Sequence, residues 1–370
     1  MTKFFSAPGR IEICGNHTDH QHGRVLAAAI NLEITASAHV NDSNIIRLIN
    51  EDIENTEINV SSLAVIKSEA GTTASLVRGI AAYFSQKGYA YGGFDAEISS
   101  SVPIGAGLSS SAAIEVLIGN IFKGLFGTDI SKMEIAKAGQ FAENNYFGKP
   151  SGLMDQTTSS FGGLNVIDFK DPDNPIVTPI NADFTGYEIC VVNTGGSHAD
   201  LTPDYAACNY EMKSVAEFFG KEYLRDVSED EFFSTIAKLR KSGDRAVLRA
   251  IHYFSDHNRV LKQAEALERK DMQSFFKLVI ESGHSSLAYL QNVYTPVKPQ
   301  DQGITLALAI SEKLLKGKGA WRVHGGGFAG TILTFLPNDL KEEFTLNMNA
   351  VFGQNCCHFL QINPNGGREM

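Results

Sequence analysis

The chain has 370 residues, of which 43% are hydrophobic and 20% charged, so two packed lobes are expected and wholesale disorder is not. Its 32 Lys and Arg residues against 42 Asp and Glu give a net charge of −10, and without a basic run nucleic acid is not expected as a partner. No apolar run approaches the roughly 20 residues that span a bilayer, and the N-terminus lacks a signal-peptide core, so no membrane association is expected.

The first hundred residues alternate predicted strands and turns. Residues 11–14 form a short strand candidate, and residues 25–38 are continuously apolar with β-branched members, which indicates a buried strand. Residues 72–86 have apolar side chains at helical spacing and predict a helix. Residues 94–99 alternate apolar and polar side chains, as in a half-buried strand.

Helices are expected after this point, over residues 112–126 and 131–145. The polar, turn-rich segment 168–175 predicts the lobe boundary, which gives an N-terminal lobe over 1–170 and a C-terminal lobe over 171–370. The second lobe is expected to contain a strand over 188–193, helices over most of 228–290 and a strand over 331–335.

The segment 103–113, PIGAGLSSSAA, carries the strongest chemical signal. It follows a predicted strand and opens a predicted helix. Its glycines let the backbone turn sharply and approach a ligand, while the N–H groups and dipole of a new helix favour an anion. The three serines add hydroxyls for phosphate or metal. A Gly-rich turn with a serine cap is the alternative, and the combination of strand, glycines, three serines and helix counts against it. The segment matches neither a Walker loop nor a Rossmann fingerprint.

A second cluster, GRIEICGNHTDHQHG over residues 9–23, crowds polar side chains after a strand, a common position for a ligand site. The spacing of His17, His20 and His22, without cysteines, is weak evidence for a metal. A neutral sugar can use the same groups as hydrogen-bond partners. Taken one by one, His20 and His22 are interpreted as solvated loop residues.

Together with the segment VHGGGFAG over 323–330, these segments resemble in order and spacing the motifs of the GHMP kinase superfamily, and most closely those of galactokinases. The signature usual in galactokinases is Gly-Arg-Val-Asn-Leu-Ile-Gly-Glu-His-Thr-Asp-Tyr, against GRIEICGNHTDH here. Further matches lie at 140–143, 148–156, 198–201 and Tyr205, so the resemblance runs over about residues 8–335.

The resemblance implies an α/β fold of two lobes with the active site between them, and an ATP-dependent sugar kinase that phosphorylates the C1 hydroxyl of galactose. It assigns Asp155 as the catalytic carboxylate with Arg10 beside it, and a nearby cation keeps such a carboxylate ionised. It assigns Ser111 and Glu143 to Mg²⁺, a cation that prefers oxygen ligands. The ATP phosphates are expected at Gly105, Gly107, Leu108, Ser109, Ser110 and Ser111.

The implied sugar pocket consists of Asn16, His17, Asp19, Gly152 and Tyr205. The chain departs from the galactokinase pattern here, because Asn16 stands where the family has a glutamate that contacts the 6-hydroxyl. An amide does not repel a carboxylate at C6, so galacturonate is an alternative substrate, with Arg24 or His17 as its counter-charge. N-acetylgalactosamine is a further alternative.

Other classes of function agree less well with these residues. A non-catalytic galactose and ATP sensor is expected to lose catalytic residues, yet Arg10, Ser111, Glu143 and Asp155 are all present. A homoserine or mevalonate kinase fits the His-Thr-Asp element less well. The five cysteines form no CxxC pair, which favours reduced thiols and a cytoplasmic location. A monomer is favoured over an oligomer.

Overall fold

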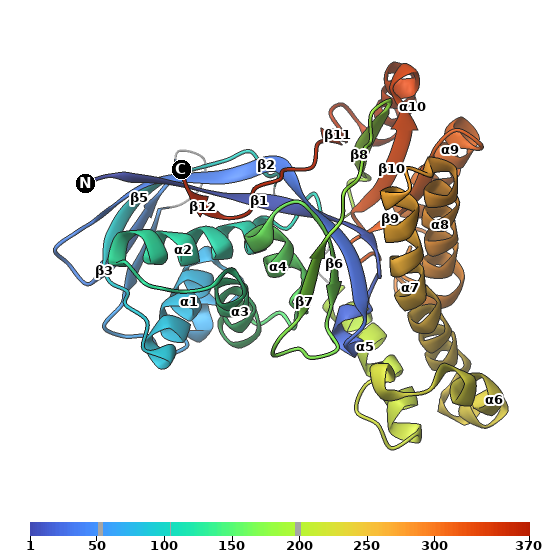
Figure 1. Ribbon diagram of the computed structural model, residues 1–370, viewed down its shortest axis with the longest axis horizontal. Helices are drawn as coiled ribbons and strands as arrows, with labels where there is room; N and C mark the ends of the chain where they lie inside the picture. The colour runs from blue at the N-terminus through green and yellow to red at the C-terminus, as the bar shows by residue number, and fades with distance from the viewer. Residues whose placement is uncertain (51–54, 104, 197–200) are drawn as a thin grey trace.

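The computed structural model describes residues 1–50, 55–103, 105–196 and 201–370 (Figure 1). Of the segments discussed above, Ile104 in the Gly/Ser-rich loop and residues 198–200 lie outside these described residues. The two termini lie near each other at one end of the larger sheet in Figure 1.

Among the described residues, eight strands form a mixed sheet in the order β12-β1-β2-β5-β3-β4, with β6 paired to β2 and β7 paired to β6. Because β2 is 17 residues long, its end pairs with β5 and its beginning pairs with β6. The strands are β1 (Lys3–Cys14), β2 (Arg24–Val40), β3 (Ile45–Ile49), β4 (Thr56–Asn59), β5 (Phe94–Ser100), β6 (Leu164–Asp168), β7 (Ile176–Pro179) and β12 (Arg368–Glu369).

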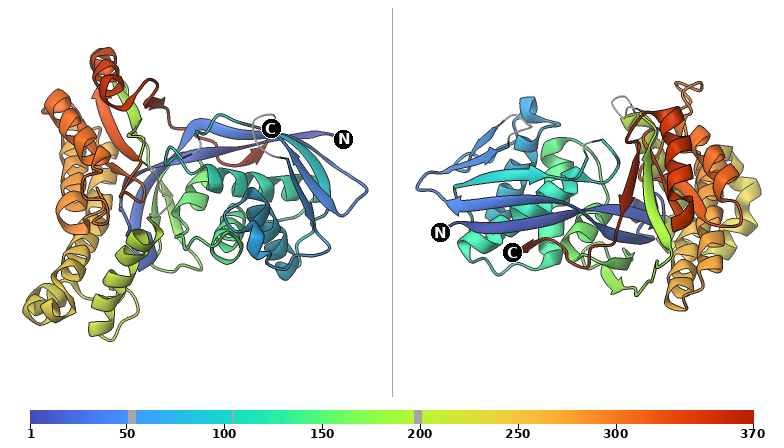
Figure 2. Two further views of the ribbon diagram at one scale, coloured as in Figure 1. Left: turned by 180° about the vertical axis from the view of Figure 1, so that it is seen from behind. Right: turned by 90° about the horizontal axis from the view of Figure 1, so that it is seen from above.

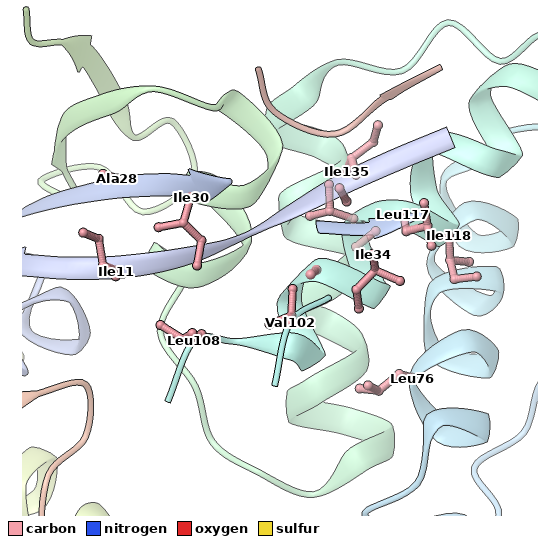
Figure 3. Close-up of a cluster of buried hydrophobic side chains, with 14 of the residues drawn as sticks. Ile11, Ala28, Ile30, Ile34, Leu76, Val102, Leu108, Leu117, Ile118 and Ile135 are labelled. Carbon is pink, nitrogen blue, oxygen red and sulfur yellow. The ribbon is translucent and has the colours of Figure 1, made fainter. Parts of the chain in front are cut away.

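Helices cover the face of this sheet that is turned downward in Figure 1. Buried aliphatic side chains such as Ile34 of β2, Leu76 and Leu117 form the core between sheet and helices (Figure 3). Burying such side chains is the main favourable term in folding. The helices are α1 (Thr73–Lys87), α2 (Ser110–Phe126), α3 (Lys132–Ala142) and α4 (Met154–Phe161).

A second, smaller sheet is antiparallel. Among the described residues it has four strands, in the order β11-β8-β10-β9. Helices α7, α8 and α9 stand beside it in Figures 1 and 2. The strands of this sheet are β8 (Tyr187–Asn193), β9 (Ala320–His324), β10 (Thr331–Pro337) and β11 (Cys357–Leu360). The helices in this part of the chain are α5 (Thr202–Phe218), α6 (Glu229–Leu239), α7 (Asp244–Glu268), α8 (Met272–Ser285), α9 (Gly303–Leu315) and α10 (Lys341–Phe352).

The predicted strands and helices are confirmed, with shifted ends. The strand predicted over 11–14 begins already at Lys3, and Pro8 lies at a register shift of the β1–β2 ladder, where a strand tolerates proline. The helix predicted from residue 72 begins at Thr73 because the Thr72 side chain accepts a hydrogen bond from the Ser75 N–H and caps it.

The lobe boundary near residue 170 stays a prediction, and β7 and β12 from beyond it join the larger sheet. In the part of the chain that the structure describes, no helix is both long and apolar enough to cross a membrane.

Candidate active site

A cavity of about 360 Å³ lies where the end of β1, the loop before α2, the start of α4 and the β9–β10 turn meet. Its volume falls in the range of small-molecule sites. The sequence-predicted residues that line it are Arg10, Asn16, His17, Asp19, Gly105, Gly107, Leu108, Ser109, Ser110, Ser111, Gly152, Asp155 and Tyr205. Of the predicted site residues only Glu143 is not among the described residues of the lining, and it lies directly behind Ser111.

The Gly/Ser-rich loop from Gly105 to Ser111, here called the anion loop, has a backbone suited to binding an anion. Gly105 and Gly107 have φ angles of 76° and 69°, in the left-handed region where glycine is favoured. A Cβ at Gly107 would lie 2.7 Å from Oγ1 of Thr331, so a larger residue cannot pack there. Ser109 is also left-handed, and α2 then begins at Ser110. The N–H groups and dipole at this helix end favour a bound phosphate.

Arg10 and Asp155 form a bidentate ion pair in the cavity. Nε of Arg10 donates to Oδ1 of Asp155 over 2.6 Å, and Nη2 donates to Oδ2 over 2.7 Å. Nη1 of Arg10 donates to the Gly107 carbonyl over 2.6 Å, so the pair is tied to the anion loop. Burial raises the pKa of Asp155, but the charge and hydrogen bonds of Arg10 outweigh it and the pKa lies below its usual value. Asp155 is therefore a carboxylate at neutral pH.

The acceptor capacity of Asp155 is almost filled. A carboxylate offers about four lone-pair sites. Arg10 occupies two of them, and the Ser109 hydroxyl donates to Oδ2. One site on Oδ1 remains for a donor from a ligand, such as a hydroxyl group. The side chain of Asp155 is 22% exposed, so a ligand in the cavity can reach it.

Glu143 and Ser111 come together because the helix α3 changes geometry. The helix predicted over 131–145 is α-helical only to Ala142 and continues as a π turn over Glu143–Phe147. Such turns often occur at functional sites. Oγ of Ser111 donates to Oε1 of Glu143 over 3.1 Å, and Nζ of Lys149 lies 3.3 Å from the same oxygen. The pair presents hard oxygen ligands behind the anion loop.

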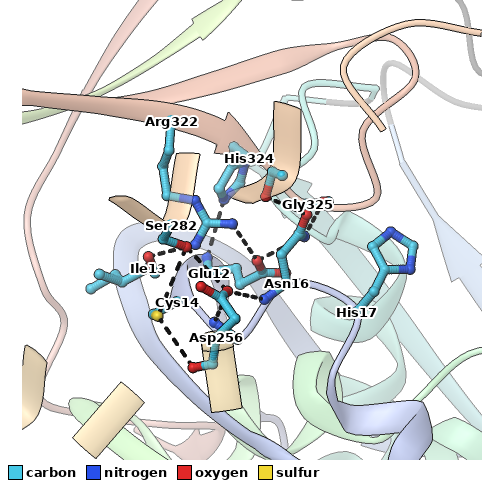
Figure 4. A network of polar contacts seen from close by, with 12 residues as sticks. Glu12, Ile13, Cys14, Asn16, His17, Asp256, Ser282, Arg322, His324 and Gly325 are labelled. Atoms are coloured by element: carbon cyan, nitrogen blue, oxygen red, sulfur yellow. Dashed lines mark hydrogen bonds and ion pairs between the residues drawn. The ribbon is translucent and has the colours of Figure 1, made fainter. Parts of the chain in front are cut away.

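The loop between β1 and β2, residues 15–23, is here called the signature loop, and a buried carboxylate on α7 fixes it. Oδ2 of Asp256 accepts the backbone N–H groups of Gly15 and Asn16 over 3.0 and 3.1 Å (Figure 4). Burial raises the pKa of Asp256, but the neighbouring His252 and Arg259 lower it by more, so the group stays ionised. This contact from α7 holds the loop that carries the predicted sugar residues.

His17 is neutral and its ring is used inside the protein. Burial lowers the pKa of His17 to about 4. Nε2 lies 2.9 Å from the Gly326 carbonyl and must carry the proton, because a carbonyl only accepts. Nδ1 then accepts from Nε2 of His20 over 3.2 Å, and the ring lies 4.8 Å from that of Tyr205. His17 and Tyr205 thus form one wall of the cavity.

The interpretation of His20 and His22 as solvated residues is wrong. Both are half-buried, His20 against His17 and His22 in a stack on Tyr223 with ring centroids 3.7 Å apart. The short 3-10 turn Asp19–Gln21 folds the loop back onto the body, which the sequence pattern does not show.

Asp19 and Gly152 meet across the cavity. A Cβ at Gly152 would lie 1.8 Å from Oδ2 of Asp19, so a larger residue there would displace this carboxylate. Burial and the charge of Asp155 raise the pKa of Asp19 to about 6. Asp19 is therefore mostly ionised at pH 7 and accepts hydrogen bonds.

The counter-charges suggested for galacturonate are absent from the described cavity. The guanidinium of Arg24 is turned away to Asp168, 2.8 Å from Nε, and to His257, 2.9 Å from Nη1, and Arg24 is not among the described lining residues. His17 carries no charge near neutral pH. A sugar carboxylate would gain no partner from either group.

Sequence reasoning gave no role to several described residues of the cavity wall, among them the ionisable Glu12, Lys149 and His324. Glu12 was detectable, because residues two apart on a strand share a face and Arg10 was already assigned to the site. Lys149 lies in a matched segment but carried no predicted role. His324 reaches the site only because β9 lies beside β1, and its Nε2 accepts the Glu12 N–H over 3.2 Å.

Comparisons with known proteins agree with this arrangement. Residues 75–163 match the model of the GHMP kinases N terminal domain, and residues 2–40 match the galactokinase galactose-binding signature. The chain is 35% identical over 341 residues to a galactokinase of Glaesserella parasuis, covering 91% of this chain and 85% of that protein. It is 34% identical to a galactokinase of Actinobacillus pleuropneumoniae, covering 91% and 86%.

The fold is shared with solved structures. The crystal structure of Lactococcus lactis galactokinase complexed with galactose superposes with a TM-score of 0.87 at 23% identity, covering 100% of this chain and 95% of that one. A mevalonate kinase superposes with a TM-score of 0.65 at 19% identity, covering 97% and 99%.

Proposed function

The chain belongs to the galactokinase family of the GHMP kinases, and on this premise we propose that it transfers the γ-phosphoryl group of ATP to the C1 hydroxyl of galactose. The products are galactose 1-phosphate and ADP. The observation that carries the proposal is the Arg10–Asp155 pair, which stands in one cavity between the anion loop and the signature loop. Asp155, Arg10 and the loop residues keep the roles predicted above.

Asp155 orients the sugar hydroxyl rather than removing its proton early. Its lowered pKa makes it a weak base, but its free site on Oδ1 accepts the hydroxyl hydrogen and directs an oxygen lone pair toward the phosphate. Phosphoryl transfer passes through a loose transition state, so positioning contributes more than proton abstraction. Once the bond to phosphorus has formed, the proton is strongly acidic and passes to Asp155.

The phosphates of ATP bind the loop from Gly105 to Ser111. Gly105 and Gly107 line the cavity with positive φ angles, and α2 starts just after them, so its N-terminal N–H groups and dipole favour a phosphate there. Lys149 lines the same cavity and lies 3.3 Å from Glu143, which supports a role in neutralising the charge of the phosphates. The sugar binds against His17, Asp19, Gly152 and Tyr205 on the other side of Asp155, where Asn16 also lines the cavity.

Ser111 and Glu143 fit Mg²⁺, because a hydroxyl and a carboxylate 3.1 Å apart are the oxygen ligands this cation prefers. Among the residues with described positions, no group of three or more His, Cys, Asp and Glu is placed to hold a metal. Two protein ligands agree with a cation that keeps waters and nucleotide phosphates in its shell. When bound, Mg²⁺ supplies charge neutralisation at the phosphates.

A coupled ADP-release assay over hexoses, N-acetylhexosamines and uronic acids tests the proposed function. Galactose is expected to give the highest kcat/KM, with galacturonate far below it. If no sugar of the panel raised ADP release above the sugar-free rate, the proposal would be overturned.

The five cysteines are free thiols, which fits the cytoplasmic location we infer. That the protein is a monomer stays a prediction.

A further inference from the structure

The amide of Asn16 has no hydrogen-bonding capacity left for a sugar. The residue is fully buried, and its Nδ2 donates to Oε1 of Glu12 over 2.9 Å and to the Gly325 carbonyl over 2.7 Å (Figure 4). Its Oδ1 accepts from Nδ2 of Asn292 over 2.7 Å and from the Ser286 hydroxyl over 3.4 Å. An amide has two donors and two lone pairs, and the protein uses all four.

Glu12 does have capacity left. Its Oε1 accepts from Asn16 and from Nη2 of Arg322, which lies 3.2 Å away. Its Oε2 has no hydrogen-bond partner among the described residues. This oxygen is not completely buried, so a ligand atom can reach it. Since Glu12 lines the cavity, this oxygen is the free end of a carboxylate that is otherwise held in place.

The position of Glu12 suits the sugar end remote from C1. Arg10 and Glu12 are two residues apart on β1, so their side chains leave the same face of the strand, about 6.6 Å apart along it. That separation is close to the distance from the C1 hydroxyl of a hexose to its hydroxyl groups at the far end. A hexose with its C1 hydroxyl at Asp155, beside Arg10, therefore extends toward Glu12.

The signature gives an independent reason. The usual galactokinase pattern has asparagine where this chain has Glu12 and glutamate where it has Asn16. The carboxylate and the amide have exchanged positions, and the two side chains are hydrogen-bonded to each other. The site thus keeps one carboxylate and one amide, with the carboxylate now on the strand.

Building on the proposed function, we propose that Glu12 is the specificity-determining residue of the sugar site. Its Oε2 accepts a hydrogen bond from a hydroxyl group of a neutral hexose, at the end of the sugar opposite C1. The contacts of Asn16 and Arg322 with Oε1 fix the orientation of the carboxylate. A sugar acid is excluded because its carboxylate would face Glu12 and Asp19, both of which line the same cavity.

Calorimetric binding of sugars without ATP tests this assignment. Glu12→Gln keeps the shape of the side chain and an acceptor for Asn16 and Arg322, but loses the charge. At pH 8, where Glu12 is ionised, it is expected to weaken galactose binding by about tenfold, as for loss of one charge-assisted hydrogen bond. One single-deoxy galactose is expected to bind Glu12→Gln and the wild-type protein equally, because that sugar lacks the contacted hydroxyl. The preference for galactose over galacturonate is expected to fall.

The control is Asp168→Asn, which removes a carboxylate paired with Arg24 and Arg225 outside the described cavity lining and is expected to bind sugars as wild type. Glu12→Asp, which keeps the charge near Arg322, is a second variant in case Glu12→Gln melts early, and is expected to show the same equality with one deoxy sugar. Galactose affinity within twofold of wild type in both Glu12 variants, or equal losses for every deoxy sugar, would overturn the assignment. A wild-type protein that binds no galactose would instead refute the proposed function.

Discussion

Replacing Arg10 with lysine keeps a positive charge at the site and removes its geometry. Arg10 makes three N–H contacts at once, at 2.6 and 2.7 Å to the two oxygens of Asp155 and at 2.6 Å to the Gly107 carbonyl. A single ammonium group cannot span these three acceptors in the way a planar guanidinium does. We expect Asp155 to lose its fixed orientation relative to the anion loop.

The size of the effect follows from the two contacts that lysine cannot replace. Hydrogen bonds to charged groups contribute about 1.5–3 kcal/mol each, which gives about 3–6 kcal/mol for two. Because the side chain of Asp155 is 22% exposed, water replaces part of the loss, and the lower end, about 3 kcal/mol, applies. That energy corresponds to roughly a 100-fold loss of rate, similar to the effect of a misplacement of about 1 Å.

The assay is kcat from ADP release at saturating galactose and ATP. Arg24→Lys is the matched control, because it makes the same change in an ion pair with Asp168 outside the described cavity lining and is expected to leave kcat unchanged. A kcat for Arg10→Lys within threefold of wild type would refute the reasoning, and so would equal losses in the two variants.

Asp155→Asn is expected to lower kcat by at least about 1,000-fold while the circular dichroism spectrum stays native, and a kcat near wild type would remove Asp155 from the catalytic role. Glu143→Gln is expected to raise the Mg²⁺ concentration needed for half-maximal activity and to weaken calorimetric binding of Mg²⁺ with ADP, so unchanged values would exclude Glu143 as a ligand. Burial raises the pKa of Asp19 to about 6 and that of Glu12 to about 7, so both carboxylates lose their charge as the pH falls. The galactose KM is therefore expected to be higher at pH 5.5 than at pH 8. A KM that does not change with pH would contradict the role of these carboxylates. Asp256→Ala leaves the Gly15 and Asn16 N–H groups unpaired and is expected to lower the free energy of unfolding in urea by about 3 kcal/mol, whereas a loss under 1 kcal/mol would show that the loop is held elsewhere.

Local patterns predicted most of the elements, because strands and helices with one buried face repeat their apolar residues at fixed spacing. The Gly/Ser-rich loop was also predictable, since positive φ angles at Gly105 and Gly107 demand glycine. The end of α3 was not, because a π turn at Glu143 follows from its contacts and has no residue signature.

The sugar side of the site was less predictable, since it depends on contacts between distant residues. Asn16 appeared to be a free amide in the sequence, but Asn292 and Gly325 meet it in the fold, some 276 and 309 residues further along the chain. Arg24 appeared to be an available cation, but Asp168 and Arg225 form an ion-pair cluster with it and with each other. No spacing rule in the sequence shows which partner such a polar side chain will take.

The most direct test of the account is the position of the new phosphate on galactose. Phosphorus and proton magnetic resonance of the product from wild-type protein, ATP, Mg²⁺ and galactose should show a single phosphomonoester on C1, and the signal should be lost in Asp155→Asn. A phosphate on any other carbon, or an undiminished C1 product in Asp155→Asn, would contradict the assignment of the Arg10–Asp155 pair to the C1 hydroxyl.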